Sequence, residues 1–266
     1  MIIEKCAENG KFDLHLHTTA SDGAYTPAEV VKMAYDKGVF TIAITDHDTI
    51  DGLEEAEAAG KALGIEVIKG VEISTKYNGK NIDILGYNVK ATTEICSVLK
   101  VLRTHREGRA QVIVDKFKNL GILINWEDVL VQSQGNSIGR PHIAKAVVEK
   151  GFAQNVQEVF DLYLADGKAC AVDKMILTPK EGISLIHEAG GIAVLAHPYL
   201  IGDDHLVEEL LKLPFEGIEV WHRSHSKEAI AVYKRFAEKY NKIKTGGSDF
   251  HHDDHTIGEF GYHEKK

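Results

Sequence analysis

The sequence predicts an α/β fold, a barrel-like domain interrupted by a helical segment. Strand and helix patterns alternate up to about residue 91, give way to helical patterns as far as about residue 172, and then resume. Alternation at this spacing predicts parallel strands joined by right-handed crossovers. With 266 residues, one domain carrying an insertion fits the length as well as two domains do.

The first elements follow from apolar runs and helix-capping residues. Thr26 and Pro27 are a preferred cap and first-turn pair, and Gly38 is a suitable helix end. A hairpin-like NGK separates the third and fourth strands. The expected strands are 11–16, 40–45, 65–74 and 81–87, and the expected helices are 26–38 and 51–63.

The middle of the chain has few strand-like runs. Helical patterns cover 92–121, 141–151 and 155–167, so we expect a helical insertion over 92–172 between barrel segments 1–91 and 173–266. The resumed alternation predicts helices at 178–191, 203–213 and 226–240, and strands at 192–196, 215–221 and 242–247.

Composition excludes several classes of protein. Hydrophobic residues make up 44% and charged residues 27%, with no low-complexity tract or 20-residue apolar run, which argues against disorder and against a membrane span. The first residues lack the apolar core of a secretory signal, so a cytoplasmic location is the default expectation. The three cysteines form no CxxC, so any metal must use histidine and carboxylate. A net charge of -9 disfavours duplex DNA as a partner.

Four polar motifs each follow an apolar strand. In FDLHLHTTASDG, His15 and His17 lie on the same side of a strand, because successive side chains alternate. In an α/β barrel the C-terminal strand ends converge on one mouth, where such folds keep their chemistry. Structural histidines and helix caps are the alternative, and for Asp48 a cap is the favoured interpretation. The motifs are HLHTTASD (15–22), TDHD (45–48), AHP (196–198) and SDFH (248–251).

These motifs, with GVE (70–72), resemble the successive motifs of the PHP (polymerase and histidinol phosphatase) family of metal-dependent phosphoesterases. RPH (140–142) inside a helical insertion is similar to the bacterial branch that dephosphorylates nucleoside 3',5'-bisphosphates and trims RNA from the 5' end. The resemblance spans nearly the whole chain. It implies a distorted (β/α)7 TIM-like barrel with a trinuclear metal centre at the mouth.

The resemblance also implies a ligand set for two to three divalent ions, Mn²⁺, Fe²⁺ or Zn²⁺. A first metal would use His15, His17, Glu72 and Asp249; a second would share Glu72 and add His197 and Asp83; a third would use Asp22, His47 and His251. Catalysis would then use a metal-bound hydroxide held by Glu72, Asp249 and His197.

Asp83 is a departure from the family pattern. The chain reads IDILGY where the family often has a phrase resembling IHILGY, so Asp83 takes the place of a histidine. A carboxylate ligand would favour Mn²⁺ or Fe²⁺ over Zn²⁺. Alternatively, Asp83 does not bind metal and the second site is weak.

Residues around the expected mouth have further possible roles. Arg140 and His142 flank Pro141 at a helix start, where backbone N–H groups favour anions, so they are candidates for binding a substrate phosphate. A salt bridge or a solvated surface arginine is the alternative. Ser21 is expected to form a turn or donate a hydrogen bond instead of acting as a nucleophile. His222 either supports the mouth or lies on the surface.

The preferred function is therefore a phosphatase or 5'-directed exonuclease that acts on a small phosphorylated nucleotide or a short RNA 5' end. A monoester phosphatase of the histidinol phosphate type is a second possibility, and a noncatalytic metal-stabilised module is a third. Neither duplex DNA nor a membrane is expected as a partner, and the sequence gives no indication of oligomeric state.

Overall fold

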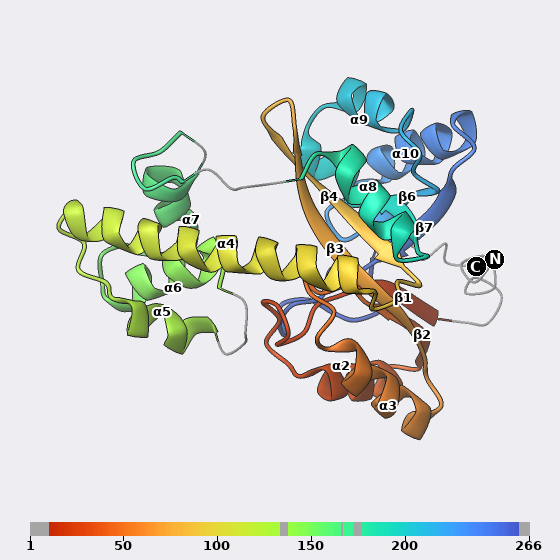
Figure 1. The fold of residues 1–266 in the computed structure, drawn as a ribbon, viewed down its shortest axis with the longest axis horizontal. Coiled ribbons are helices and arrows are strands. Elements are labelled where there is room, and N and C mark those ends of the chain that lie inside the picture. The colour runs from red at the N-terminus through yellow and green to blue at the C-terminus, as the bar shows by residue number, and fades with distance from the viewer. Residues whose placement is uncertain (1–10, 134–137, 166, 173–176, 261–266) are drawn as a thin grey trace.

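The core of the protein is a seven-stranded sheet that closes almost into a barrel (Figure 1). The structure, a computed structural model, describes residues 11–133, 138–165, 167–172 and 177–260. Strand order in the sheet follows chain order, and a bridge from Leu16 to Phe250 joins its two ends. The α/β barrel prediction is thus confirmed. The strands are β1 (Lys11–Leu16), β2 (Val39–Ile44), β3 (Glu66–Tyr77), β4 (Lys80–Tyr87), β5 (Ile192–Leu195), β6 (Gly217–His222) and β7 (Ile243–Gly247).

One strand runs against the others. β4 is antiparallel to both β3 and β5, whereas the remaining neighbours are parallel. The cause is the short turn at Asn78 and Gly79, which have φ angles of 49° and 80° and lead β3 directly back into β4. The barrel therefore departs from strict β/α alternation here, and the first half of β4 lies at the mouth.

Five α-helices and the short 3-10 helix η2 (Pro198–Ile201) accompany the barrel strands in the described part of the chain (Figure 1). Thr26 with Glu29, and Thr178 with Glu181, form capping boxes at the starts of two of them, because each threonine accepts a backbone N–H that the first turn leaves unpaired. Buried apolar residues of all five α-helices belong to the barrel core. The α-helices are α2 (Pro27–Asp36), α3 (Leu53–Leu63), α8 (Pro179–Glu188), α9 (Asp204–Leu210) and α10 (Lys227–Lys239).

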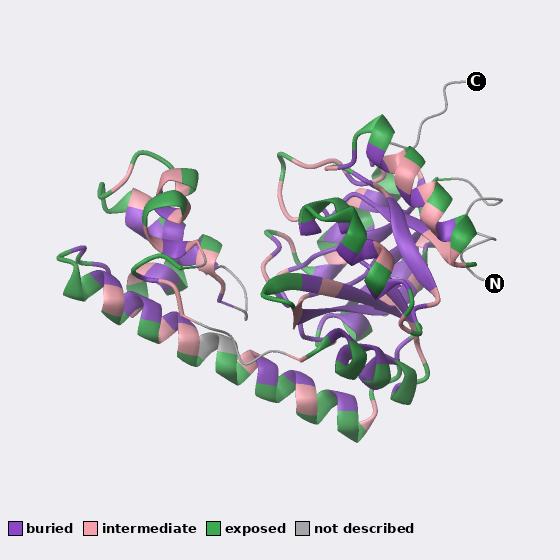
Figure 2. Cartoon of the chain, turned by 90° about the horizontal axis from the view of Figure 1, so that it is seen from above, coloured by how far each residue is buried: buried purple, intermediate pink, exposed green. Residues whose placement is uncertain are grey.

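The helices of the middle segment form a second group beside the barrel (Figure 1). The long helix α4 connects the two: Ile95 and Leu99 belong to the barrel core, whereas Val114 and Phe117 belong to a separate core (Figure 2). None of the described helices is both long and apolar enough to cross a membrane. The helices of this segment are α4 (Thr93–Asn119), α5 (Trp126–Ser133), α6 (Arg140–Glu149), α7 (Val156–Val159) and the π-helix η1 (Phe160–Leu164).

The two ends of the sheet meet at a very close contact. A Cβ atom on Gly247 of β7 would lie 2.2 Å from the Cβ of His15 on β1, so no side chain fits there. Glycine at this position lets β7 approach the strand that carries the first histidines.

Candidate metal centre

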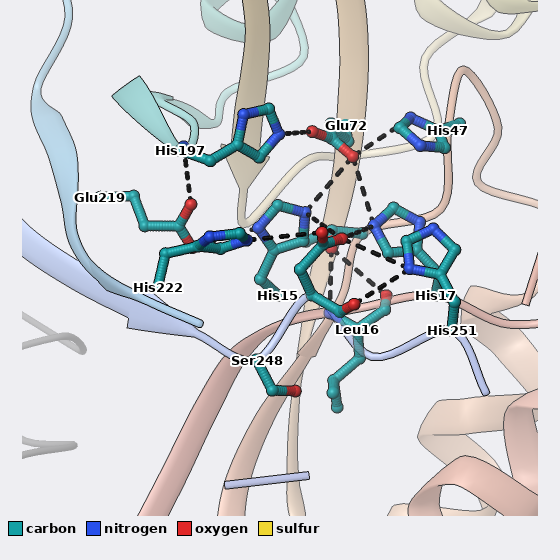
Figure 3. A network of polar contacts seen from close by, with 12 residues as sticks. His15, Leu16, His17, His47, Glu72, His197, Glu219, His222, Ser248 and His251 are labelled. Carbon is teal, nitrogen blue, oxygen red and sulfur yellow. Dashed lines mark hydrogen bonds and ion pairs between the residues drawn. The ribbon is translucent and has the colours of Figure 1, made fainter. Parts of the chain in front are cut away.

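The histidines and carboxylates of the four strand-end motifs come together at the barrel mouth (Figure 3). His15 lies near the end of β1 and His17 directly after it, His47 follows β2, and Asp249 follows β7. The parallel strands bring these groups together because their C-terminal ends open on the same side of the barrel.

Glu72, in the middle of β3, lies at the centre of the cluster (Figure 3). Its Oε2 lies 3.3 Å from the Nε2 atoms of both His15 and His17, and 3.1 Å from Nδ1 of His47. Its Oε1 lies 2.9 Å from Nε2 of His197. One fully buried carboxylate therefore connects four histidines from the C-terminal ends of three other strands, β1, β2 and β5.

A second set of contacts surrounds Asp22 and Asp249. Oδ1 of Asp22 lies 3.3 Å from Nε2 of His251, and its Oδ2 lies 3.9 Å from Nε2 of His47. Oδ1 of Asp249 lies 3.3 Å from Nε2 of His17. Asp249 has a left-handed φ of 52°, and such strain is typical of functional positions.

The donor set fits divalent metal ions. Donor atoms on a metal with bonds of about 2.1 Å lie roughly 3 to 3.5 Å apart, which is the spacing around Glu72. Both ring nitrogens of His17 are buried and make no hydrogen bond within the described residues, as expected for a ring that binds metal. The groups spaced to hold a metal are His17–Asp22–His47–His251, His15–His17–Asp249, His15–Glu72–His197 and His15–Glu219–His222.

The electrostatics of the mouth favour ionised carboxylates. Burial raises the pKa of Glu72, but positive charge on His47 and His15 outweighs it and holds this pKa well below its usual value. The pKa of Asp249 is also held well below its usual value, since His15 outweighs the effect of burial. Burial lowers the pKa of His17, whereas the carboxylates of Asp249 and Glu72, each 3.3 Å from its Nε2, raise it, to about 10. The lowered pKa values of the carboxylates and the raised pKa of His17 thus share one cause, the close packing of imidazole and carboxylate groups.

Neighbouring polar residues hold the loops instead of joining the cluster. Asp46 accepts the Thr18 N–H at 2.7 Å and the Ser21 hydroxyl at 2.5 Å, so Ser21 is a hydrogen-bond donor, as expected. Asp48 does not cap the following helix, and that interpretation was wrong: its Oδ1 accepts the backbone N–H of Ser74 on β3 at 3.0 Å. These contacts tie the loop after β1 to the loop after β2, and the loop after β2 to β3, the strand that carries Glu72.

Two buried groups at the mouth were not among the sequence-based candidates for metal ligands. Glu219 is fully buried, and its Oε1 lies 3.1 Å from Nδ1 of His15. His222 is 1% exposed, and its Nε2 lies 3.4 Å from Oδ2 of Asp249. Both lie on β6, where the register shifts between Glu219 and Trp221. That irregularity breaks the two-residue alternation from which side-chain direction is read.

A cavity of about 240 Å³ extends from the metal centre to the helical segment. Asp83 and Asn81 of β4 line its barrel side, while Arg109, Arg140 and the ring of Phe160 line the helical side. Asp22 and His47 form its metal end, and Ser74, Gly139 and Pro141 complete the wall. Asp83 belongs to none of the four donor groups. Burial lowers the pKa of His197, but Glu72 and, to a smaller extent, the charge of Asp83 raise it, to about 9.

Of the two residues expected to bind substrate, Arg140 lines the cavity and His142 is buried at the start of α6. Arg140 Nη1 donates to the carbonyl of Leu164 at 3.0 Å, and its guanidinium carbon lies 6.0 Å from the centroid of the Phe160 ring, at the cavity wall. His142 is 4% exposed, and its Nδ1 accepts the N–H of Gly139 at 3.1 Å, so it stabilises the start of α6. Arg109, in the middle of α4, was not singled out from the sequence, since a long polar helix offers no signal for one arginine.

A nearly closed α/β barrel with buried histidines and carboxylates at its mouth defines a class of metal-dependent hydrolases. Sequence comparison narrows the class, because residues 13–175 match the PHP domain. The chain belongs to the PHP family of metal-dependent phosphoesterases, as the motifs predicted.

Relatives of known name cover nearly the whole chain. The 5'-3' exoribonuclease of Haemophilus influenzae is 37% identical, over 91% of this chain and 90% of that protein. The 3',5'-nucleoside bisphosphate phosphatase of Chromobacterium violaceum is 32% identical, over 90% and 86%. A solved structure of an amidohydrolase from Chromobacterium violaceum, with bound sulfate, superposes with a TM-score of 0.86 at 31% identity, over 94% of this chain and 91% of that one.

Proposed function

We propose that this phosphoesterase acts on nucleotides that carry two phosphates: it removes the 3'-phosphate of nucleoside 3',5'-bisphosphates and degrades short RNA from its 5' end. The observation that carries the proposal is the cavity that joins the metal-end residues Asp22 and His47 to Arg109 and Arg140. The activities named for the two relatives support the same substrate class.

In this proposal two to three divalent ions occupy the mouth. The donor groups support His15, His17, Glu72 and Asp249 for one metal, His197 with shared Glu72 for another, and Asp22, His47 and His251 for a third. Asp83 is the ninth proposed ligand, within electrostatic reach of His197. Bound divalent ions would activate a water as nucleophile and neutralise charge on the phosphate. We propose Mn²⁺, Fe²⁺ or Zn²⁺ as the metal, because the donors are imidazoles and carboxylates.

The chain's own side chains supply the recognition of the second phosphate. Arg140 is oriented by its hydrogen bond to Leu164, and Arg109 by a hydrogen bond of 2.7 Å from Nε to the carbonyl of Val172. Guanidinium groups fixed in this way bind phosphate oxygens with charge-assisted hydrogen bonds. His142 contributes by holding the start of α6, which fixes the direction of Arg140. The helical segment 92–172 thereby determines which esters the centre receives.

The test compares a nucleoside 3',5'-bisphosphate, the corresponding 3'-monophosphate and histidinol phosphate as substrates of the metal-loaded protein. We expect the bisphosphate to have the highest kcat/KM, because only it reaches the metals and both arginines. Preference for histidinol phosphate would overturn the proposal in favour of a monoester phosphatase. A trinucleotide RNA with a 5'-phosphate should be cleaved faster than one with a 5'-hydroxyl, for the same reason.

Metal analysis addresses the noncatalytic alternative. Two to three equivalents of transition metal per chain, with loss of turnover on chelation and recovery on reloading, are expected for the enzyme. A protein that holds no metal and has full thermal stability without it would refute the ligand assignment.

A further inference from the structure

Both carboxylate oxygens of Glu219 contact residues of the candidate metal centre (Figure 3). Oε1 lies 3.1 Å from Nδ1 of His15, and Oε2 accepts the backbone N–H of His197 at 2.7 Å. Its side chain is fully buried. A buried carboxylate with two such contacts holds two candidate ligands in fixed positions at once.

The contact with His15 determines which ring nitrogen can bind metal. A neutral imidazole has one N–H and one lone pair. Nε2 of His15 faces Glu72 at 3.3 Å and Asp249 at 3.6 Å, so it lies toward the cluster. When Nδ1–H donates to Glu219, the lone pair stays on Nε2, where a metal would need it.

The same geometry argues against a separate cation site at His15–Glu219–His222, although these donors lie within 4.8 Å of one another. A cation there would need the Nδ1 lone pair of His15 and would leave Nε2 protonated toward the cluster. His222 Nδ1 accepts the backbone N–H of Ser224 at 3.1 Å, so the neutral ring carries its proton on Nε2, toward Asp249, and has no lone pair there for a cation. Three of the four donor groups thus remain as candidate metal sites. Glu219 is not a ligand in any of them and instead contacts two of the ligands.

The second contact acts on a strained residue. His197 has a φ of 22°, outside the regions that non-glycine residues favour, and Glu219 holds its backbone N–H. Fixing this N–H helps to keep the His197 ring where its Nε2 lies 2.9 Å from Oε1 of Glu72. The neighbouring group His17–Asp22–His47–His251 includes neither residue that Glu219 contacts.

We propose that Glu219 is a positioning residue that fixes the tautomer of His15 and the backbone of His197, and so controls metal occupancy at the positions those two histidines serve. The inference rests on the ligand assignment proposed above. It predicts selective metal loss: positions that use His15 and His197 weaken, while the group around Asp22 and His251 keeps its metal.

The variant Glu219→Gln tests this with little change in shape. The backbone N–H of His197 can only donate a hydrogen bond. The side-chain oxygen of the new glutamine therefore turns toward it, and the NH₂ group faces Nδ1 of His15. That arrangement favours the lone pair on Nδ1 and removes it from Nε2. We expect metal affinity at the affected positions to fall by about 10- to 100-fold, the usual effect of changing such a supporting group. Glu219→Asp keeps the charge, but its shorter side chain cannot keep both contacts, so it should retain more metal than Glu219→Gln and less than the wild type.

Glu216→Gln is the matched control. Glu216 also accepts from a histidine and a backbone N–H, at 3.0 Å from Nε2 of His187 and 2.8 Å from N of Ala193, but it precedes β6 and lies outside the donor groups. Metal content after dialysis and metal-induced thermal stabilisation are measured for the wild type and each variant. Loss of part of the metal in Glu219→Gln alone supports the proposal.

Equal metal retention in Glu219→Gln and the wild type would overturn the positioning role, as would equal loss in Glu216→Gln. A wild-type protein that binds no metal would instead refute the ligand assignment itself, so the two failures are distinguishable. If Glu219→Gln does not fold, Glu219→Asp replaces it in the same measurements: partial metal loss supports the positioning role, and full retention overturns it.

Discussion

Removal of the Arg140 side chain should reduce hydrolysis of a nucleoside 3',5'-bisphosphate far more than hydrolysis of the 3'-monophosphate. Arg140 lines the cavity wall opposite the metal end, and its orientation is set by Leu164 and by the ring of Phe160. A hydrogen bond to a charged group contributes about 1.5 to 3 kcal/mol. At about 1.36 kcal/mol per tenfold change in rate, Arg140→Ala should lower kcat/KM for the bisphosphate by about 10- to 150-fold.

The assay measures kcat/KM for both substrates in Arg140→Ala, Arg140→Lys and the wild type, with metal content checked in each. The lysine variant should be intermediate, because it keeps the charge but loses the planar pair of donors. Arg235→Ala, at an exposed position of α10, is the control and should match the wild type. An equal loss for the bisphosphate and the monophosphate would show that Arg140 supports the centre instead of binding a second phosphate.

Three further substitutions test the centre and the barrel. Asp249→Ala should abolish turnover with the fold intact by circular dichroism; collapse of the fold would favour a structural role. Asp83→His should shift metal preference toward Zn²⁺, whereas unchanged metal content and activity would mean that Asp83 is not a ligand. Gly247→Ala should lower the free energy of unfolding by about 1 to 3 kcal/mol, since its Cβ would lie 2.2 Å from His15 Cβ. Its control is Gly108→Ala in α4, which has open space around it and should stabilise the helix. Similar denaturation midpoints for the two variants would contradict the predicted steric clash between a side chain at position 247 and His15.

The parts of the site that follow regular strands were predictable from sequence. The two-residue period of β1 places His15 and His17 on one side, and the structure has them 5.1 Å apart between ring centroids. Glu72 lies inside a long strand, and only the resemblance of GVE to a family motif brought it forward. Glu219 was missed because the irregular register of β6 breaks the period, whereas His222 was predicted as one of two alternatives, a support of the mouth or a surface residue.

The cavity wall was harder to predict for a different reason. Arg109 lies within a 27-residue helix, and nothing in the helical periodicity distinguishes an arginine that faces a cavity from one that faces water. Its position depends on how α4 packs against two cores, which is a long-range property. The short helix α5 was also missed, because its eight residues give too few turns for a clear pattern.

Helix α4 packs in two hydrophobic cores. The candidate metal ligands belong to the barrel, whereas the cavity arginines lie on helices of the second core. Arg109 lies between Leu102, which packs in the barrel core, and Ala110, which packs in the other. Local unfolding of the second core would withdraw both cavity arginines while the barrel kept its metal donors. If the arginines bind the second phosphate as proposed, such a partly opened protein would still hydrolyse simple phosphate monoesters, and the cooperativity of a remote helical core would set how narrow the substrate range is.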